Sequence, residues 1–581
     1  MSACLRRWRV PDLQLVRNVS LLVDTALRHL LEDPLLLAVQ SARRLPRGAR
    51  GGVARLVGAG AAPTSVRRAL SEFLVDRREQ SRLSLAGSAP ASDVGRRLAA
   101  ELAVQLGDVA LAYADDLPVQ VRARELWSRG HASAALTLLD GVVQARAQRA
   151  RLRGELALMS PGFRLPVPSP SPTWAGPTAG AHPRVLHVLT NSLPRTQSGY
   201  AVRSHALLRA QLQAGVEVRA LTRVGYPVTV GLVSARGVDV VDGIEYHRLL
   251  PGRLAPTPAA RLVQMTQLVA RQVEELRPDV LHTTTDFHNA LVTQAVAEGF
   301  GLPWVYEMRG VLEQTWVASR PQEKQKEALS SQRFRLLRAK ETEMALAADA
   351  VVVLSQVQKE DLVERGVPAR RITVVPNAVE DEVVEVSALK PAAARAHLGL
   401  PADGYWAGSV SSLVDYEGFD VLLEAVARCR AEGVDLRCLL VGDGVSRPAL
   451  EARAAALGLG EDVCVLPGRV PPQEAVAWYQ ALDVFCVPRR DTPVCRSVTP
   501  MKPLTAMALG RPVVVSDLPA LREVAAYSDG ECFEPGDAAA LASVLAGAAR
   551  RTDSTRPHGH NDLPRWSRNG QINAALYEEL R

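Results

Sequence analysis

The chain has 581 residues, of which 47% are hydrophobic, 23% charged and 4% aromatic, and its formal net charge is +7. At roughly 100–200 residues per domain this length predicts about three domains, and the composition excludes a largely disordered chain. No apolar run reaches the roughly 18 residues that a membrane-spanning helix needs, which excludes a polytopic membrane protein.

The positive charge is concentrated near the N-terminus, where residues 1–180 contain 25 arginines, no lysine and 15 acidic residues. No basic stretch carries the interleaved aromatic residues on which single-stranded nucleic acids stack, so we expect no nucleic-acid partner. The first twenty residues lack the apolar segment of a secretory signal, and the seven cysteines form no CxxC pair. We therefore expect a cytoplasmic protein with free thiols and no metal site.

Residues 1–160 are predicted to be helical, because apolar residues recur at intervals of three and four. The glycine-rich stretch 48–65 should interrupt the helices, and residues 123–143 resemble one helical hairpin of a tetratricopeptide array. A linker rich in proline, serine and glycine follows over residues 161–182. The helical pattern is clearest over 13–31, 94–114 and 119–159.

From Arg184 onward, short apolar segments alternate with amphipathic helices, which predicts βαβ units and parallel sheets. We expect an α/β fold with two Rossmann-like domains, residues 183–380 and 381–550, facing a cleft and preceded by the helical domain. The remaining polar segment, 551–581, should end in a helix that packs back on the first Rossmann-like domain. Ligands of such folds bind at the carboxyl ends of the strands. The predicted strands are RVLHVLT, VEVRALT, DVLHTT, PWVYEMRG, ADAVVVLS, ITVVPNAV, YWAGSVS, LRCLLVGDG, DVCVLPG, VFCVPRR and PVVVSD.

Three junctions of the first Rossmann-like domain carry candidate site residues. Gly199, in SLPRTQSGYAVRSHALL, would let a phosphate approach the start of the following helix, although a plain tight turn explains it equally well. His282 or His288, in DVLHTTTDFHNALV, could face the cleft, the alternative being a core or surface histidine. Glu307 and Arg309, in PWVYEMRG, would share one side, so that the glutamate orients an arginine able to bind a diphosphate or makes only a packing ion pair.

The second domain offers a loop rich in arginine, proline and threonine, VPRRDTPVCRSVTPMKPLTAMALG. Arg496 and Lys502, together with free amides at the start of the helix that holds Thr505, would suit a pyrophosphate leaving group. Asn377, Gly442 and Gly444 lie at strand-to-loop junctions, where they could contact a ligand or simply form turns.

In this order, these motifs resemble the glycosyltransferases of family 4 with the GT-B fold. The resemblance covers roughly residues 184–548 and rests on SGYAVRSH, YEMRG, the succession of ADAVVVLS and VVPNAV, GSVSSLVDYEGFDVLLEA, LLVGDG and VTPMKPLTAMALGRPVVVSD. It implies transfer of a hexosyl-type sugar from a nucleotide-diphosphate sugar with retention of configuration (EC 2.4 class), without a metal or another cofactor. The C-terminal domain would hold the donor and the first Rossmann-like domain the acceptor.

The resemblance adds residues to those that the pattern of strands suggests. Our catalytic candidates are His282, His288, Glu307 and Arg309. Our donor-binding candidates are Gly199, Tyr200, Arg203, Asn377, Ser409, Gly442, Gly444, Arg496, Thr499, Lys502 and Thr505.

The sequence departs from the family pattern at two places. The glutamate expected before AMA is Thr505, and the one eight residues earlier falls near Arg496 or Ser497, so the Glu-x7-Glu pair is absent. We place Ser409 and Glu417 where the GRLxxxKG segment has its arginine and lysine.

Three functions remain open at this stage. The first is an active glycosyltransferase that builds a cell-envelope or exported glycan on a glycan, lipid-linked or small-molecule acceptor. The second is a catalytically impaired member that binds a nucleotide sugar or a protein, and the last is a nucleotide-sugar 2-epimerase. The basic helical region would contact a protein or the inner face of the cell membrane, where anionic lipid attracts basic groups at about 1 kcal/mol each.

Overall fold

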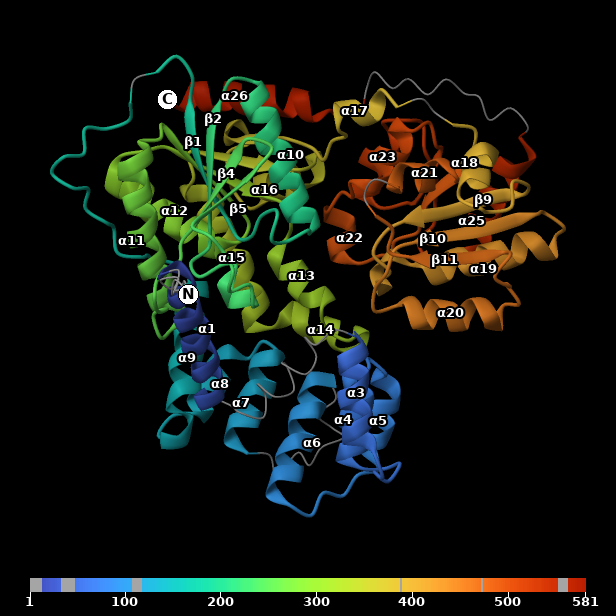
Figure 1. Cartoon of the computed structure of the whole chain (residues 1–581), viewed down its shortest axis with the longest axis horizontal. Coiled ribbons are helices and arrows are strands. Elements are labelled where there is room, and N and C mark those ends of the chain that lie inside the picture. The colour runs from blue at the N-terminus through green and yellow to red at the C-terminus, as the bar shows by residue number, and fades with distance from the viewer. Residues whose placement is uncertain are drawn as a thin grey trace, which may run out of the picture.

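The computed structural model describes residues 13–32, 47–106, 118–178, 180–386, 389–471, 474–551 and 563–581. It confirms an α/β fold in which two sheets dominated by parallel strands follow a helical N-terminal region (Figure 1). Within the described residues, no helix is both long enough and apolar enough to cross a membrane.

The first Rossmann-like domain contains an eight-stranded sheet in the order β3-β4-β2-β1-β5-β6-β7-β8, in which only β3 and β4 pair in antiparallel orientation. Sequence analysis missed this hairpin, whose turn is Asp242-Gly243 with positive φ at both residues, as a type I′ turn requires. The strands are β1 (Arg184–Leu189), β2 (Glu217–Thr222), β3 (Val238–Val241), β4 (Ile244–Arg248), β5 (Val280–Thr284), β6 (Trp304–Met308), β7 (Ala350–Val353) and β8 (Ile372–Val374).

Helices cover both faces of this sheet, so its central strands are apolar and buried along their whole length. The helices are α10 (Gly199–Gln213), α11 (Pro258–Leu276), α12 (Phe287–Phe300), α13 (Leu312–Ala318), α14 (Gln322–Ser330), α15 (Gln332–Ala347) and α16 (Gln356–Glu364).

The second domain contains a six-stranded parallel sheet in the order β11-β10-β9-β12-β13-β14. Its strands are β9 (Tyr405–Val410), β10 (Leu436–Val441), β11 (Cys464–Gly468), β12 (Val484–Val487), β13 (Val513–Ser516) and β14 (Glu531–Phe533). The accompanying helices are α17 (Asp381–Val384), α18 (Pro391–His397), α19 (Phe419–Ala431), α20 (Arg447–Ala456), α21 (Ala475–Gln480), α22 (Pro493–Ser497), α23 (Lys502–Ala508), α24 (Pro519–Ala525) and α25 (Ala538–Arg550).

The described part of residues 1–160 is helical, with one correction to the prediction; the end of the predicted helical segment 94–114, after Leu106, lies outside the described residues. The stretch 48–65 interrupts the helices only in its last part, residues 59–65, because α3 runs through residues 48–58. Ala54 is buried, and its carbonyl accepts a hydrogen bond from Ser71 of α4 at 2.7 Å, so packing against α4 overrides the poor helix propensity of glycine. The helices are α1 (Leu13–Glu32), α3 (Arg47–Gly58), α4 (Val66–Leu74), α5 (Arg78–Ala86), α6 (Asp93–Leu106), α7 (Val119–Ser128), α8 (Ala132–Leu138) and α9 (Arg146–Met159).

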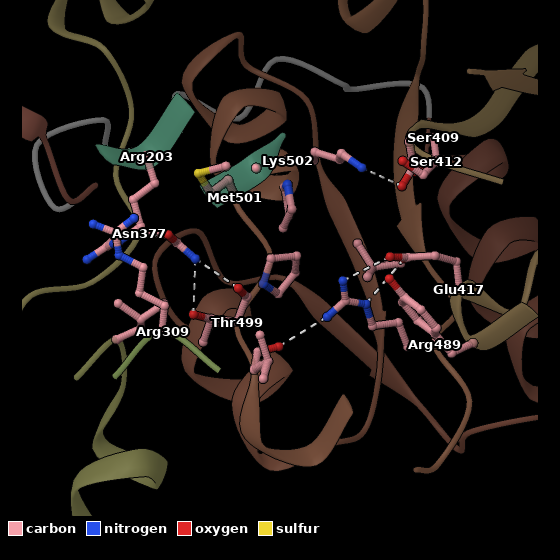
Figure 2. Close-up of a pocket in the computed structure, with 18 of the residues that line it drawn as sticks. Arg203, Arg309, Asn377, Ser409, Ser412, Glu417, Arg489, Thr499, Met501 and Lys502 are labelled. Carbon is pink, nitrogen blue, oxygen red and sulfur yellow. Dashed lines mark hydrogen bonds and ion pairs between the residues drawn. The ribbon is translucent and has the colours of Figure 1, made fainter. Parts of the chain in front are cut away.

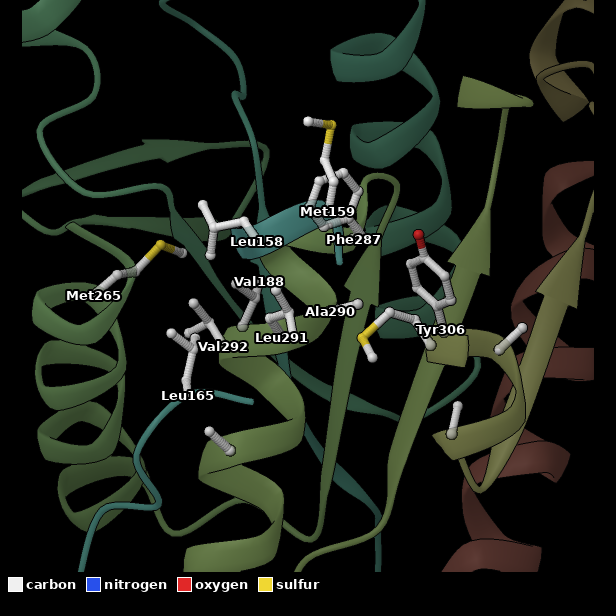
Figure 3. Close-up of a cluster of buried hydrophobic side chains, with 14 of the residues drawn as sticks. Leu158, Met159, Leu165, Val188, Met265, Phe287, Ala290, Leu291, Val292 and Tyr306 are labelled. Atoms are coloured by element: carbon white, nitrogen blue, oxygen red, sulfur yellow. The ribbon is translucent and has the colours of Figure 1, made fainter. Parts of the chain in front are cut away.

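The last of these helices share the core of the first Rossmann-like domain. Leu158 and Met159 of α9 lie in the same buried cluster as Phe287 and Leu291 of α12, and Leu165 of the linker packs there too (Figure 3). Helices α4, α5 and α6, in contrast, enclose a small core of their own. The N-terminal region is thus partly built into the sheet domain.

The C-terminal helix α26 (Trp566–Leu580) returns to the first Rossmann-like domain and packs along α10 (Figure 1). Trp566 and Tyr577 are buried there in one cluster with residues of β1 and α10. At the closest approach, a Cβ on Gly570 would lie 2.2 Å from the carbonyl oxygen of Ala210. Only a glycine therefore lets the two helices come this close.

We expect Gly570→Ala to lower the free energy of unfolding by roughly 1–3 kcal/mol, because α10 and α26 must separate to admit the methyl group. The matched control is Gly547→Ala in α25, where a Cβ meets nothing within 4 Å. That substitution should instead stabilise the protein by roughly 0.5–1 kcal/mol through helix propensity. Thermal denaturation of both variants measures the difference, and equal midpoints would contradict the close packing.

Candidate functional site

A cavity of about 310 Å³ lies between the two Rossmann-like domains, at the carboxyl ends of strands from both sheets (Figure 2). Its size falls within the usual range for small-molecule sites, roughly 300–1,000 Å³. It is lined by Gly199, Tyr200, Arg203, Arg309, Leu354, Asn377, Ser409, Ser411, Ser412, Tyr416, Glu417, Phe485, Val487, Arg489, Val498, Thr499, Pro500, Met501, Lys502 and Pro503.

The wall from the first domain is organised by Glu307, which lies in β6 directly behind the cavity and is fully buried. Arg203 of α10 donates from Nε and Nη2 to Glu307 Oε1 at 3.1 and 3.0 Å, and Arg309 donates from Nη2 to Glu307 Oε2 at 2.7 Å. Burial alone would raise the pKa of Glu307, but Arg309 and Arg203 outweigh it and hold that pKa well below its ordinary value. The carboxylate is therefore charged and orients both arginines.

The two arginines differ in how their other donors are used. Arg203 also donates to the carbonyl of Val375 and to Asn377 Oδ1, and although burial lowers its pKa to about 10, it stays charged at neutral pH. Arg309 Nη1 donates to Ser204 Oγ at 2.6 Å, while its Nε is buried without a hydrogen-bond partner. Arg309 lines the cavity, but this unused Nε is buried and is not exposed to it.

Asn377 connects the two domains across the cavity. Its Oδ1 accepts from Arg203 Nη1 at 2.9 Å, and its Nδ2 donates to the carbonyl of Thr499 at 2.8 Å (Figure 2). Thr499 belongs to the loop between α22 and α23 that carries the VTP motif. This amide therefore links the arginine pair of the first domain to that loop.

The wall from the second domain holds a buried ion pair. Arg489, just after β12, donates from Nε and Nη2 to the two carboxylate oxygens of Glu417 at 3.2 and 2.9 Å. Burial alone would lower the pKa of Arg489, but attraction to Glu417 outweighs it and raises that pKa. Lys502 Nζ donates to Ser411 Oγ at 2.7 Å, and burial lowers the pKa of this lysine.

Two helices begin at the cavity, and they differ as sites for an anion. The N-cap of α10 is Ser198, and Gly199 and Tyr200 of its first turn line the cavity. Helix α23 spans only seven residues and has Pro503, which lacks an N–H, in its first turn. Amide donors at α23 are therefore fewer than the sequence suggested, and the cationic side chains dominate this end of the cavity.

The structure brings eight of the fifteen predicted site residues to the cavity wall and places Glu307 behind it. The eight are Gly199, Tyr200, Arg203, Arg309, Asn377, Ser409, Thr499 and Lys502. They come from both domains, so the cavity unites residues that lie up to about 300 positions apart in the sequence.

Neither predicted histidine lines the cavity. His282 lies in the middle of β5, is fully buried and contacts Tyr577 and Glu307, so it is a core residue behind the site. His288 lies in the first turn of α12, where its Nδ1 is 2.7 Å from Asp286 Oδ1. The pattern at the end of the strand could not decide which of its residues turns toward the cleft.

Four donor-binding candidates also lie outside the cavity wall. A Cβ on Gly442 would lie 1.8 Å from the carbonyl oxygen of Ser411, and one on Gly444 would lie 2.0 Å from that of Leu413. These glycines therefore make room for neighbouring backbone and not for a ligand. Arg496 is exposed and makes an ion pair with Asp491 at 2.5 Å. Thr505 lies one turn inside α23 and does not line the cavity.

Sequence reasoning missed several cavity residues, and one of them by miscounting. Counting back from Glu417, the arginine of the GRLxxxKG pattern falls at Ser412 and not at Ser409, and both serines line the cavity. Arg489 ends a strand in VFCVPRR, which was a usable signal. Its ion pair with Glu417 could not be predicted, because no local pattern relates residues 72 positions apart.

In total, four cationic side chains reach the cavity and two carboxylates lie among them, which leaves a positive surplus suited to a diphosphate. No group of three or more histidine, cysteine, aspartate or glutamate residues in the described part of the chain is arranged to hold a metal ion.

Behind the first-domain wall lies a second buried carboxyl group. Glu341 of α15 accepts from the amide of Phe287 at 2.9 Å and from the hydroxyl of Tyr306 at 2.5 Å. Burial raises the pKa of Glu341 to about 8, although the Tyr306 hydrogen bond works against the shift. The side chain is therefore largely protonated at neutral pH.

Two family models match the chain in succession. The family described as glycosyl transferase 4-like domain matches residues 198–378, and the one described as glycosyl transferases group 1 matches residues 405–550. Each match coincides with one Rossmann-like domain, and the cavity lies between them.

Curated relatives are similar over part of their length. A D-inositol 3-phosphate glycosyltransferase of Thermobispora bispora is 30% identical over 220 residues, which cover 35% of this chain and 50% of the relative. A 2-deoxystreptamine glucosyltransferase of Streptomyces kanamyceticus is 32% identical over 184 residues, which cover 31% of this chain and 46% of the relative. The chain thus spans about half the length of the curated relatives that it matches.

Among solved structures, a sucrose-phosphate synthase from Thermosynechococcus elongatus has a TM-score of 0.51 and 20% identity, and the match covers 68% of this chain and 99% of that one. At this identity the likeness concerns the fold alone.

The raised pKa of Glu341 makes stability depend on pH. The unfolded chain releases the Glu341 proton near pH 4.5 and the folded chain near pH 8, so stability should fall by about 1.4 kcal/mol per pH unit between these values. In Glu341→Gln this fall should disappear, whereas the exposed control Glu461→Gln should keep it. Urea denaturation from pH 4.5 to 8.5 measures the slope, and parallel slopes in all three proteins would contradict a shifted Glu341.

Proposed function

This chain belongs to the glycosyltransferases that join a 4-like domain to a group 1 domain, and we propose that it transfers a hexosyl-type sugar from a nucleotide-diphosphate sugar to an acceptor. The observation that carries the proposal is the cavity between the domains, where Arg203, Arg309, Arg489 and Lys502 converge. A diphosphate leaving group gains negative charge as the glycosidic bond breaks. Fixed cations in a site that excludes water stabilise that charge where it develops.

The residues have distinct roles in this proposal. Arg309 and Lys502 line the cavity from opposite domains and would face the departing diphosphate, while Glu307 holds Arg309 in place. Ser409 and Ser412 line the second-domain side, where the nucleotide would lie. Gly199 and Tyr200 line the first-domain side, toward the acceptor. Such a site works by positioning and electrostatics and requires no protein nucleophile or metal.

Retention of configuration is part of the proposal through the family resemblance. The acceptor would be a glycan, a lipid-linked saccharide or a small molecule of a cell-envelope or exported-glycan route. The names of the relatives support an acceptor with several hydroxyl groups, since both refer to cyclitol substrates. The alternative of a catalytically impaired nucleotide-sugar-binding protein receives no particular support from the relatives, which are named as a glycosyltransferase and a glucosyltransferase.

Lys502→Met should lower kcat/KM for the preferred donor by about 10²–10³-fold, because a cation aimed at the leaving group is lost while the length of the side chain is kept. The matched control Lys390→Met removes an exposed lysine of the second domain and should leave the rate unchanged. A panel of labelled UDP-, GDP- and TDP-sugars, followed for hydrolysis and transfer, provides the measurement.

The same panel tests the proposed function itself. Turnover of one donor with retention, read from the anomeric configuration of the product, supports it. Binding of a nucleotide sugar without turnover of any donor would favour the impaired alternative, and free epimerised sugar nucleotide would favour an epimerase.

We also propose that helix α1 attaches the protein peripherally to an anionic membrane surface. Its inner side packs on the first Rossmann-like domain, where Leu21 is fully buried and Asn18 Nδ2 donates to the carbonyls of Val233 and Ala235 at 2.8 Å. Its outer side exposes Leu13, Val16, Val19, Val23 and Leu27, each by 44% or more. An exposed apolar stripe in a region with an arginine excess is typical of helices that lie in a lipid interface.

Flotation with vesicles of phosphatidylcholine and increasing phosphatidylglycerol tests this attachment. Binding should rise with the anionic fraction, fall with added salt and be lost in Val16→Ser/Val23→Ser, but persist in the control Val363→Ser/Val445→Ser, which alters exposed valines elsewhere. Binding that ignores the anionic fraction would overturn the proposal. A dimer that only the α1 variant loses would identify the stripe as a protein contact.

A further inference from the structure

The C-terminal helix α26 reaches the surroundings of the arginine pair at two points, one at Arg203 and one at His282. The ring of Trp566, its first residue, lies 5.3 Å from the Arg203 guanidinium carbon, in a cation–π arrangement. Near the other end, the hydroxyl of the fully buried Tyr577 lies 2.7 Å from His282 Nδ1. Neither α26 residue lines the cavity, so any influence on it passes through other side chains.

A chain of hydrogen bonds runs through Tyr577. Gln211 Nε2 donates to the Tyr577 hydroxyl oxygen at 2.9 Å, and Gln211 Oε1 lies 2.9 Å from His187 Nε2. The Tyr577 proton is then free to be donated to His282 Nδ1. His187 and His282 stack at 4.6 Å, and burial lowers the pKa of both, so both rings are neutral.

These hydrogen bonds determine which nitrogen of His282 carries the proton. Because a neutral imidazole that accepts at Nδ1 carries its proton on Nε2, the N–H of His282 faces Glu307, whose Oε2 lies 3.4 Å away. The opposite tautomer would turn a lone pair toward this buried carboxylate. The distance is too long for a good hydrogen bond, so the contact is an electrostatic one across buried, poorly screened space.

Glu307 Oε2 is also the atom to which Arg309 donates. The ring of His282 therefore borders the carboxylate oxygen that orients Arg309, on the side away from the cavity. A change in the His282 tautomer would bring a nitrogen lone pair close to the Glu307 carboxylate. The repulsion would shift Glu307 and with it Arg309.

We propose that Tyr577 is a positioning residue of the site, which fixes the His282 tautomer and through Glu307 the orientation of Arg309. The inference rests on the proposed function for its effect on sugar transfer. Its structural part, the tautomer of His282, stands independently of that function.

The same arrangement recurs elsewhere in this domain and supplies a matched control. The buried Tyr246 lies with its hydroxyl 2.8 Å from His205 Nδ1, and His205 Nε2 is 2.8 Å from Asp242 Oδ2. None of these three residues lines the cavity. Tyr577→Phe and Tyr246→Phe therefore remove the same hydroxyl from the same kind of contact, one beside the site and one away from it.

We expect both variants to fold, with similar small losses in thermal midpoint. Tyr577→Phe alone should lower kcat by about tenfold, with a change in donor KM of less than about twofold, because a slight displacement of a group that acts in the transition state mainly slows the chemical step. It should also weaken the binding of inorganic pyrophosphate, a mimic of the leaving group, measured by calorimetry. In the ¹⁵N spectrum of histidine-labelled protein, the His282 signals should move from a pure Nε2–H tautomer toward a mixture.

An unchanged His282 tautomer in Tyr577→Phe would overturn the proposal. A loss of kcat and of pyrophosphate affinity equal to that of Tyr246→Phe would also overturn it, since the effect would then be one of general stability. If the natural protein turns over no donor, the proposed function fails while the tautomer and the pyrophosphate affinity still decide the role of Tyr577.

Discussion

The site depends on a single buried charge, the carboxylate of Glu307. Burying three charged groups is costly, and it is sustained here because Glu307 bonds to both arginines and the remaining Arg203 donors reach Val375, Pro376 and Asn377. Without Glu307, two buried guanidinium groups would face each other without a counter-charge. Because Asn377 in turn donates to Thr499, the same carboxylate helps to fix the loop that the second domain contributes. One strand residue thus organises groups from four segments of the chain.

Segments before and after the first Rossmann-like domain in the sequence support the domain that carries this charge. Helix α9 and the linker pack into the core with α11 and α12, whereas α26 packs with α10, and the two lie in separate buried clusters (Figures 1 and 3). The helices that flank the strand ends, α10 and α12, therefore each have a partner from outside the Rossmann-like domain. Helix α9 is therefore an integral part of this domain, whereas α4, α5 and α6 enclose a core of their own.

The fold was largely predictable because alternating short apolar segments and amphipathic helices are a local property of the sequence. The site was predictable where a residue follows the carboxyl end of a strand, as Arg309 and Asn377 do, or begins a helix after a distinctive loop, as Lys502 does. It was not predictable where the answer depends on a partner far along the chain. His282 lies beside Tyr577, which is 295 residues away, and a local pattern therefore placed His282 in the cleft. Glu417 lies beside Arg489, and the local pattern showed only that a lysine of the family motif was missing there. For the same reason the helical pattern of α9 could not reveal that Met159 packs on Phe287.

The pair of Glu417 and Arg489 bears most directly on the departure from the family pattern. A carboxylate where the pattern has a lysine would repel a diphosphate if it stood alone. Here both of its oxygens accept from Arg489, which also donates to the carbonyl of Val498 and so is anchored on the loop of the VTP motif. The pair is neutral as a unit, and Lys502, held by Ser411, adds a further positive charge to this wall. On the proposed function, cationic contact with the donor would then come from the segments after β12 and at the start of α23 instead of from the loop after β9. A glutamate at position 417 is consequently compatible with binding a diphosphate, because its charge is already used in placing an arginine.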